Sequence, residues 1–201
     1  MPSAQKNLQR ATELAFDALA HQTDEQFRWL GADRAADFWR LPVLNDVFQI
    51  DTRRRRVFSS AGSEVGPAWR ILALHYLAVR GRPEQRPPEV TFADIPTARS
   101  YAEVYRRRTT LRLCAGVGRS LAELQAGAAA LGARAAVGGD AAFDFLVFPR
   151  LSLRLIWQAP DEEFPPLTTL LVPANIGAFF CAGDIVVVSE SLVSRLCGRP
   201  F

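Results

Sequence analysis

Two alternating runs of apolar and polar residues meet at a proline in the last third of the sequence, and they constrain the fold more than any other feature. The first run covers residues 143–148, the second covers residues 151–157, and Pro149 and Arg150 lie between them. A period of two is typical of a β-strand with one buried face. The pattern therefore predicts an antiparallel hairpin with one apolar side.

The register of this hairpin follows from burial. A two-residue loop would set Phe145 opposite Arg154. A three-residue loop that starts at Phe148 sets Phe145 opposite Leu153 instead. It also sets Asp144 opposite Arg154, so that the large apolar residues share one face and the two charges pair on the other. Because exposing a large apolar side chain costs roughly 1.5–3 kcal/mol, we expect the three-residue loop.

Helical spacing of apolar residues predicts helices in other parts of the chain. An amphipathic helix is expected over residues 4–20, followed by a short second helix through Phe27 and Leu30. The other expected helices cover residues 67–80, the segment after Ser100, residues 120–131 and residues 184–196. The 67–80 helix starts at Pro67, should stop at a left-handed Gly81, and is apolar on nearly all faces. We therefore expect it to be central and buried.

Further strands are predicted on both sides of these helices. The segment DVFQIDTRRRRVFSS favours two short strands joined by a turn near Asp51 to Arg54. The proline-rich residues 82–96 exclude a helix but allow a short edge strand at Val90 to Phe92. A last strand is expected over residues 168–172.

Together these elements predict an α+β protein. The early hairpin, the 143–157 hairpin and the 168–172 strand should form one mixed, mainly antiparallel sheet. One face of this sheet should be covered by the helices 67–80, 120–131 and 184–196. Residues 1–32 are expected to form an N-terminal helical arm, and residues 33–201 a single α+β domain.

The residue types that most enzymes use for chemistry are scarce. Lys6 is the only lysine, and His21 and His75 are the only histidines. A phosphate loop or a lysine Schiff base would have to use a lysine at the frayed N-terminus, and a zinc protease motif lacks its histidine pair. His75 lies on the apolar 67–80 helix, where a core histidine with satisfied hydrogen bonds is favoured over a general base.

Charge and cysteine usage limit the location and the partners. The net charge is only +3, from 24 Lys plus Arg and 21 Asp plus Glu, which is too small for a general nucleic-acid binder. The three cysteines, Cys114, Cys181 and Cys197, form no Cys-x-x-Cys pair, which favours a reducing, cytoplasmic location. No stretch approaches the roughly 20 apolar residues of a membrane span, so no membrane association is expected.

Three segments carry a resemblance to a known family. They are WRILALHYLAVRG, TFADIPTARSYAEVYRRRT and GDAAFDFLVFPRLSLRLIWQAPDEEFPPLTTLLV. Over about residues 45–197 the chain resembles the bacterial and archaeal family called domain of unknown function 3786. The resemblance implies a setting near corrinoid and one-carbon metabolism. Some relatives carry an attached iron–sulfur segment, and this chain departs from them because it has no cysteine cluster.

The candidate binding residues, which include Trp157, lie around the second hairpin. Asp161, Glu162 and Glu163 follow Trp157 and precede a stiff Phe-Pro-Pro segment. Crowded carboxylates can hold a hard cation or raise one pKa for acid–base chemistry, although a simply solvated turn is favoured about two to one. The hairpin should bring Asp140 near this turn as a further ligand.

One more candidate lies at the hairpin turn. Arg150 could present its guanidinium to a carboxylate or phosphate, although a solvated arginine is the more common outcome at a turn.

Three function classes follow from these residues. The preferred one is a non-catalytic binding or accessory module with a protein partner or a second copy of itself. The alternatives are a carboxylate-based enzyme, with or without a divalent cation, and an anion or RNA binder that uses the arginines at 53–56 and 106–108. No catalytic residue, metal ligand set or cofactor is assigned, and nucleic acid is the least favoured partner. An enclosed cleft around the carboxylates favours the enzyme, whereas an open apolar patch favours the module.

Overall fold

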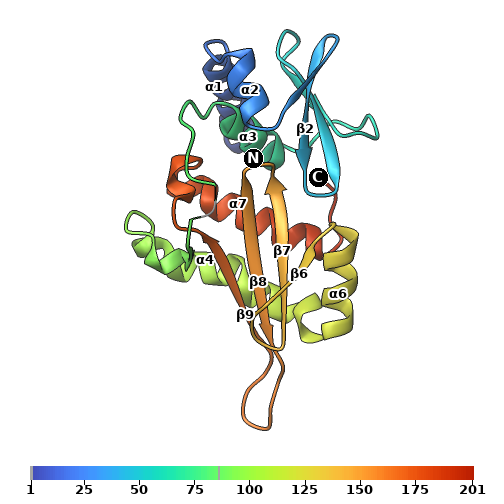
Figure 1. Ribbon diagram of the computed structural model, residues 1–201, viewed down its shortest axis with the longest axis vertical. Coiled ribbons are helices and arrows are strands. Elements are labelled where there is room, and N and C mark those ends of the chain that lie inside the picture. Colours follow the sequence, from blue (N-terminus) through green and yellow to red (C-terminus); the bar gives the residue numbers. More distant parts are fainter. Residues whose placement is uncertain (1, 86) are drawn as a thin grey trace.

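The alternating run forms the central hairpin of a five-stranded sheet in the computed structural model, which describes residues 2–85 and 87–201 (Figure 1). The strand order is β5-β9-β8-β7-β6, and every neighbouring pair is antiparallel. The strands are β5 (Glu89–Thr91), β6 (Arg134–Ala136), β7 (Ala141–Phe148), β8 (Leu151–Gln158) and β9 (Leu167–Pro173).

The predicted register of the β7–β8 hairpin is confirmed. Phe145 pairs with Leu153, and Asp144 pairs with Arg154. The Arg154 guanidinium donates two hydrogen bonds to the Asp144 carboxylate, at 2.7 and 2.9 Å. Phe145 and Leu153 are fully buried on the opposite face. Burial of one face therefore sets the register, as the sequence pattern predicts.

The predicted three-residue loop is wrong, because a β-bulge supplies the extra residue. Phe148 pairs with Leu151, which leaves a two-residue turn, Pro149–Arg150, and the register shifts between Leu146 and Phe148. The bulge lets both Val147 and Phe148 point into the core, where both are fully buried. The bulge thus allows the hairpin to have both a continuous apolar face and a two-residue turn.

The early hairpin belongs to a second sheet, so the prediction of one sheet is wrong. This four-stranded antiparallel sheet has the order β1-β2-β3-β4. Its strands are β1 (Asp33–Ala35), β2 (Phe38–Val43), β3 (Asp46–Asp51) and β4 (Arg56–Phe58). The β3–β4 hairpin was predicted, whereas β1 and β2 were not. Pro42 argues against a strand at this position, because proline has no N–H to donate to a neighbouring strand. β1 pairs only with residues 38–40, so β2 has no neighbour on that side at Pro42 and the proline is tolerated.

The two sheets meet at the bulge. The backbone N–H of Leu44, in the turn between β2 and β3, donates to the Val147 carbonyl at 3.2 Å. The bulge leaves this carbonyl outside the β7–β8 pairing, so it can accept a bond from the other sheet. A single hydrophobic core then runs through both halves of the molecule.

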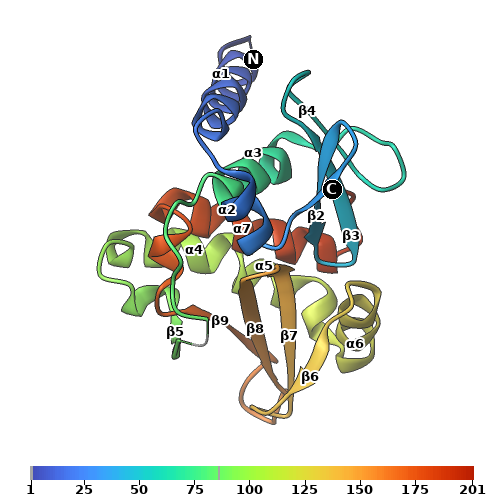
Figure 2. The ribbon, with the colours of Figure 1, turned by 45° about the horizontal axis from the view of Figure 1, so that its top comes forward.

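Helices cover one face of the five-stranded sheet and fill the space beside the smaller one, in agreement with the predicted α+β class (Figures 1 and 2). The α-helices are α1 (Pro2–Leu19), α2 (Asp24–Trp29), α3 (Pro67–Leu77), α4 (Ala102–Arg108), α5 (Thr110–Ala115), α6 (Leu121–Ala130) and α7 (Ala182–Leu196). Figure 1 shows α7 crossing behind β7 and β8. The N-terminal α1 packs on α3. None of the described helices is long and apolar enough to cross a membrane.

The buried helix α3 ends earlier than predicted and by a different mechanism. Its last residue is Leu77, and Gly81 does not adopt the predicted left-handed conformation. The side-chain amides of Gln22 and Gln26 donate instead to carbonyl oxygens at the end of the helix and just beyond it, at 2.7–3.0 Å. Two glutamines from the N-terminal segment therefore satisfy carbonyl groups at the end of the helix, which a terminal glycine usually does by letting the backbone turn back on itself.

The buried hydroxyl of Tyr76 offers a test of how the helices hold the hairpin. It donates to the Leu30 carbonyl at 2.8 Å and accepts from the Arg150 backbone N–H at 3.0 Å. Tyr76→Phe leaves both backbone groups unpaired, so we expect the free energy of unfolding in urea to fall by about 1–3 kcal/mol. The exposed Tyr101 provides the control, Tyr101→Phe, which should leave stability unchanged. Equal stability of the two variants would contradict this role of the hydroxyl.

Candidate functional site

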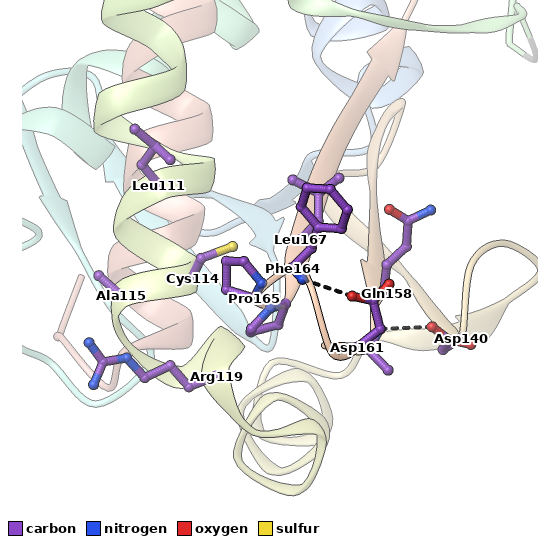
Figure 3. Close-up of a pocket in the computed structure, with 12 residues that line it drawn as sticks. Leu111, Cys114, Ala115, Arg119, Asp140, Gln158, Asp161, Phe164, Pro165 and Leu167 are labelled. Carbon is purple, nitrogen blue, oxygen red and sulfur yellow. Dashed lines mark hydrogen bonds between the residues drawn. The ribbon is translucent and has the colours of Figure 1, made fainter.

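A groove of about 1020 Å³ lies between α5 and the loop that joins β8 to β9 (Figure 3). Its apolar walls come from both sides. They comprise Leu111, Cys114 and Ala115 of α5, and Phe164, Pro165, Pro166 and Leu167 of the loop and the start of β9. Three of these large side chains are well exposed, with 43% of Leu111, 65% of Phe164 and 55% of Leu167 accessible to solvent.

The β8–β9 loop presents Phe164 because Asp161 organises the turn before it. One carboxylate oxygen of Asp161 accepts hydrogen bonds from the backbone N–H groups of Glu163, at 2.9 Å, and Phe164, at 2.7 Å. The Asp161 N–H donates in return to the Phe164 carbonyl at 3.0 Å. This is a side-chain turn of the kind that aspartate favours, and the two prolines that follow stiffen the chain further.

Asp140 fixes the start of the same loop. Its carboxylate accepts from the Ala159 N–H at 2.7 Å, and its own N–H donates to the Trp157 carbonyl at 3.0 Å. Gly139 permits this close approach, because a β-carbon there would lie 2.5 Å from the Trp157 carbonyl oxygen. Asp140 and Asp161 both line the groove, so the structure brings these two candidate residues together.

The other two acidic candidates, Glu162 and Glu163, are not among the residues that line the groove. Glu162 and Glu163 are exposed at the tip of the loop, which projects beyond the sheet at the lower end of Figure 1. Within the described residues, no set of three or more histidine, cysteine, aspartate and glutamate side chains is placed to hold a metal ion. The geometry therefore gives no support to a cation site at this turn, which the sequence analysis treated as the less favoured alternative to a solvated turn.

Trp157 supports the groove from behind. Its ring is buried, and its indole N–H donates to the Gly118 carbonyl at 2.7 Å. Gly118 in turn packs so tightly on α5 that a β-carbon would lie 2.8 Å from the Leu113 carbonyl oxygen. Trp157 thereby holds the end of α5 against β8. It does not line the groove, so its role is to position the helical wall and not the ligand contact that the sequence analysis considered.

Arg150 lies at the opposite end of β8 from the groove. Its guanidinium donates to the Trp29 carbonyl at 2.8 Å and to the Gln85 side chain at 2.9 Å, and it lies over the Trp29 ring. These bonds tie α2 to the β7–β8 turn. The structure therefore separates Arg150 from the acidic candidates.

The sequence analysis missed two parts of the groove, the wall formed by α5 and the side chain of Phe164. Leu111 and Cys114 lie on a short helix about 50 residues away from the loop, and no motif marks them. Phe164 did carry a signal, because it is a large aromatic residue in an otherwise charged and proline-rich turn. An aromatic residue in such a turn has no strand or helix face through which to reach the core.

A second cluster of ionisable groups joins α3 to the start of α7. His75 Nδ1 lies 2.9 Å from one carboxylate oxygen of Asp184, and the Cys181 thiol donates to the same oxygen at 3.3 Å. His75 is hydrogen-bonded as expected, but its side chain is 36% exposed, so it lies at the edge of the core and not within it. Burial acts to raise the pKa of Asp184, but the hydrogen bonds from His75 and Cys181 outweigh it and hold that pKa below its usual value.

This cluster predicts a defined pH dependence of stability. Asp184→Asn should lower the free energy of unfolding by about 1 kcal/mol at neutral pH, because it removes a hydrogen bond to a charged group. Because the pKa of Asp184 is lower in the folded state, the advantage of the parent protein is complete above pH 3.8, the usual value, and is lost as the pH falls below it.

Urea titrations over a pH series measure this difference. The exposed Asp37 supplies the control variant, Asp37→Asn, which should match the parent protein at every pH. A deficit of Asp184→Asn that stays constant in strong acid would contradict the assignment of the effect to this carboxylate.

The fold and the groove define a protein of two antiparallel sheets and seven described α-helices, with an apolar groove beside an acidic loop. A family model described as "Domain of unknown function (DUF3786)" matches residues 25–195. Because this is most of the chain, the protein belongs to that family, and the resemblance in the sequence is confirmed. No curated protein and no solved structure matches the chain.

Proposed function

We propose that this protein is a non-catalytic binding module whose groove beside α5 holds an apolar side chain of a partner protein. The observation that carries the proposal is the gathering of Leu111, Phe164 and Leu167 around one groove with their side chains exposed. Exposed apolar residues that occur singly are ordinary, but a contiguous group with a polar rim is typical of an interaction site.

The rim of the groove indicates the charge of the partner. Asp140 and Asp161 lie on the rim, and Glu162 and Glu163 continue along the loop. Arg119 is the basic residue among those that line the groove. This excess of negative charge favours a partner segment in which lysine or arginine flanks the apolar residue, because complementary charge speeds association and selects partners.

The groove is also preorganised. The Asp161 turn, the two prolines and the Trp157 hydrogen bond hold its walls in place before a partner arrives. A rigid site loses less conformational entropy on binding, so more of the contact energy appears as affinity.

The two alternative functions stay predictions. For the enzyme, both aspartates line the groove, but each already uses one carboxylate oxygen to hold the loop backbone. For RNA binding, many of the arginines are paired with carboxylates. Arg106 and Arg107 pair with Glu103, and Arg108 and Arg112 pair with Glu190. The setting near corrinoid and one-carbon metabolism and the cytoplasmic location likewise stay predictions.

Selection from a random peptide library tests the proposal directly. The library is selected for binding to the parent protein, and peptides that also bind the Phe164→Ser variant are removed. We expect the remaining sequences to be enriched in a large apolar residue next to lysine or arginine. Synthetic copies should bind Phe164→Ser at least about tenfold more weakly, a loss of about 1.4 kcal/mol, because the aromatic wall is gone. Fluorescence anisotropy measures the dissociation constant.

Leu146→Ser is the matched control, because Leu146 is 50% exposed on β7 and does not line this groove. It should bind the peptides as the parent protein does. Peptides that bind both serine variants equally well, or an absence of selected sequences, would overturn the proposal.

The acidic loop predicts a salt-dependent contribution. The double variant Glu162→Gln with Glu163→Gln removes two exposed charges that do not line the groove, so we expect the dissociation constant for a basic peptide to rise a few-fold at low salt. The difference from the parent protein should shrink at high salt, because screening weakens surface charges. Anisotropy titrations at two ionic strengths measure it. A difference that is independent of salt would exclude this electrostatic role.

A further inference from the structure

A pocket of about 540 Å³ lies between α3 and α7, which pack against each other (Figure 2). The residues of α7 that line it lie three or four positions apart and so share one face of that helix; they include Val187, Ser191 and Ser194. Ala68 lines the pocket from α3. Because the two serines and this alanine are small, the helices leave a space here that longer side chains would fill.

The floor of this α3–α7 pocket is apolar. Trp69, Leu72 and Val187 line it, and the first two of these residues are almost fully buried. Pockets of about 300–1,000 Å³ with mainly apolar walls and a few polar groups are typical of sites for small molecules. The floor therefore suits a ligand with a hydrocarbon body.

A surplus of positive charge lies in one part of the pocket wall. Arg108 and Arg112 both pair with Glu190, so one carboxylate serves two guanidinium groups. The Arg112 guanidinium lies 3.6 Å from Glu190, which is too long for a hydrogen bond, so its donors stay available to a ligand. Asp184 also lines the pocket, but its carboxylate is already bonded to His75 at 2.9 Å.

A buried hydroxyl without a partner lies in the same wall. Ser191 lines the pocket, is only 8% exposed, and directly follows Glu190, the residue that both arginines contact. Two residues earlier, the Ser189 hydroxyl accepts from the Tyr105 hydroxyl at 3.1 Å, whereas the described residues give the Ser191 hydroxyl no hydrogen bond. Because an unpaired buried polar group costs free energy, a molecule in the pocket that bonds this hydroxyl is favoured.

We propose that the α3–α7 pocket binds a small organic acid, whose carboxylate is held by Arg112 and the Ser191 hydroxyl while its hydrocarbon body lies on Trp69 and Leu72. A carboxylate matches the planar guanidinium, which can donate two parallel hydrogen bonds to it. The site is separate from the proposed function, because no residue lines both this pocket and the groove beside α5.

The same features disfavour other classes of ligand. A cation would meet two guanidinium groups, and a neutral molecule would leave the charge of Arg112 uncompensated. A doubly charged phosphate exceeds the surplus of one positive charge that Glu190 leaves against the two arginines. A singly charged acid with an apolar body therefore fits both the wall and the floor.

Calorimetric titration of the parent protein with unbranched acids from butanoate to decanoate tests the site. For the acid that binds most tightly, the neutral amide and the amine of the same chain length are the comparison probes, each below the concentration at which it forms micelles. We expect the dissociation constant of the amide to be at least about tenfold higher than that of the acid, because it lacks the charge that pairs with Arg112. The amine should not bind.

Two variants test the polar wall. Arg112→Gln should raise the dissociation constant of the acid at least about tenfold but that of the amide less than about twofold, because the apolar floor is unchanged. Ser191→Ala should raise the constant of the acid a few-fold. Arg107→Gln is the matched control, because Arg107 is an exposed arginine of α4 that pairs with Glu103 and does not line the pocket. It should bind the acid as the parent protein does.

Amide chemical shifts locate the bound acid. The signals of Val187 and Ser191 should change most on titration, and those of Ala159 and Leu167, which line the groove beside α5, should stay constant. Equal affinity for the acid and the amide, equal losses in Arg112→Gln and Arg107→Gln, changes centred on Leu167, or no binding of any acid in the series would each overturn the site. None of these results bears on the binding module, which the peptide selection tests separately.

Discussion

The β7–β8 turn is the constraint on which the rest of the structure depends, because three separate parts of the chain are bonded to it. The Val147 carbonyl at the bulge accepts from Leu44 of the smaller sheet, the Arg150 N–H donates to the Tyr76 hydroxyl of α3, and the Arg150 guanidinium donates to the Trp29 carbonyl of α2. Tyr76 is fully buried, and Leu44 and Trp29 are partly buried, so the loss of these bonds leaves polar groups unpaired where water reaches them poorly. Since β8 begins at this turn and ends at the groove, the turn also fixes where the acidic loop projects.

The hairpin shows how far the sequence can predict this fold. The pairing of Phe145 with Leu153 followed from burial alone, because a slip of one residue would turn every large side chain toward water. The turn length did not follow, since local residues do not reveal the Leu44 bond that stabilises a bulge at Val147. The second sheet was missed for a similar reason. Pro42 argues against a strand unless it is known that the neighbouring strand ends before it.

The candidate site, like the hairpin, could be predicted from the sequence only in part. The proximity of Asp140 to Asp161 could be predicted, because a hairpin of known register carries the first residue of one strand to the end of the next. The apolar wall could not, because Leu111 reaches the loop only through the contact of Trp157 with Gly118 and the close packing of Gly118 on α5. The structure therefore changes the role that we assign to the two aspartates. Both aspartates hold loop backbone, and their charge lies on the rim of an apolar surface.

An open strand edge is normally a hazard, since unpaired N–H and C=O groups can recruit strands of other molecules and cause aggregation. This molecule limits that hazard in two ways. Asp94 occupies the outward N–H of Thr91 on β5, and β6 at the other edge is only three residues long. Beyond the end of β5, Phe92 lies opposite Leu170, and residues 168–170 face a groove bounded by α4 and not open solvent. The sheet edge of a second molecule cannot enter such a groove, so α4 and Phe92 protect the part of β9 that β5 leaves uncovered.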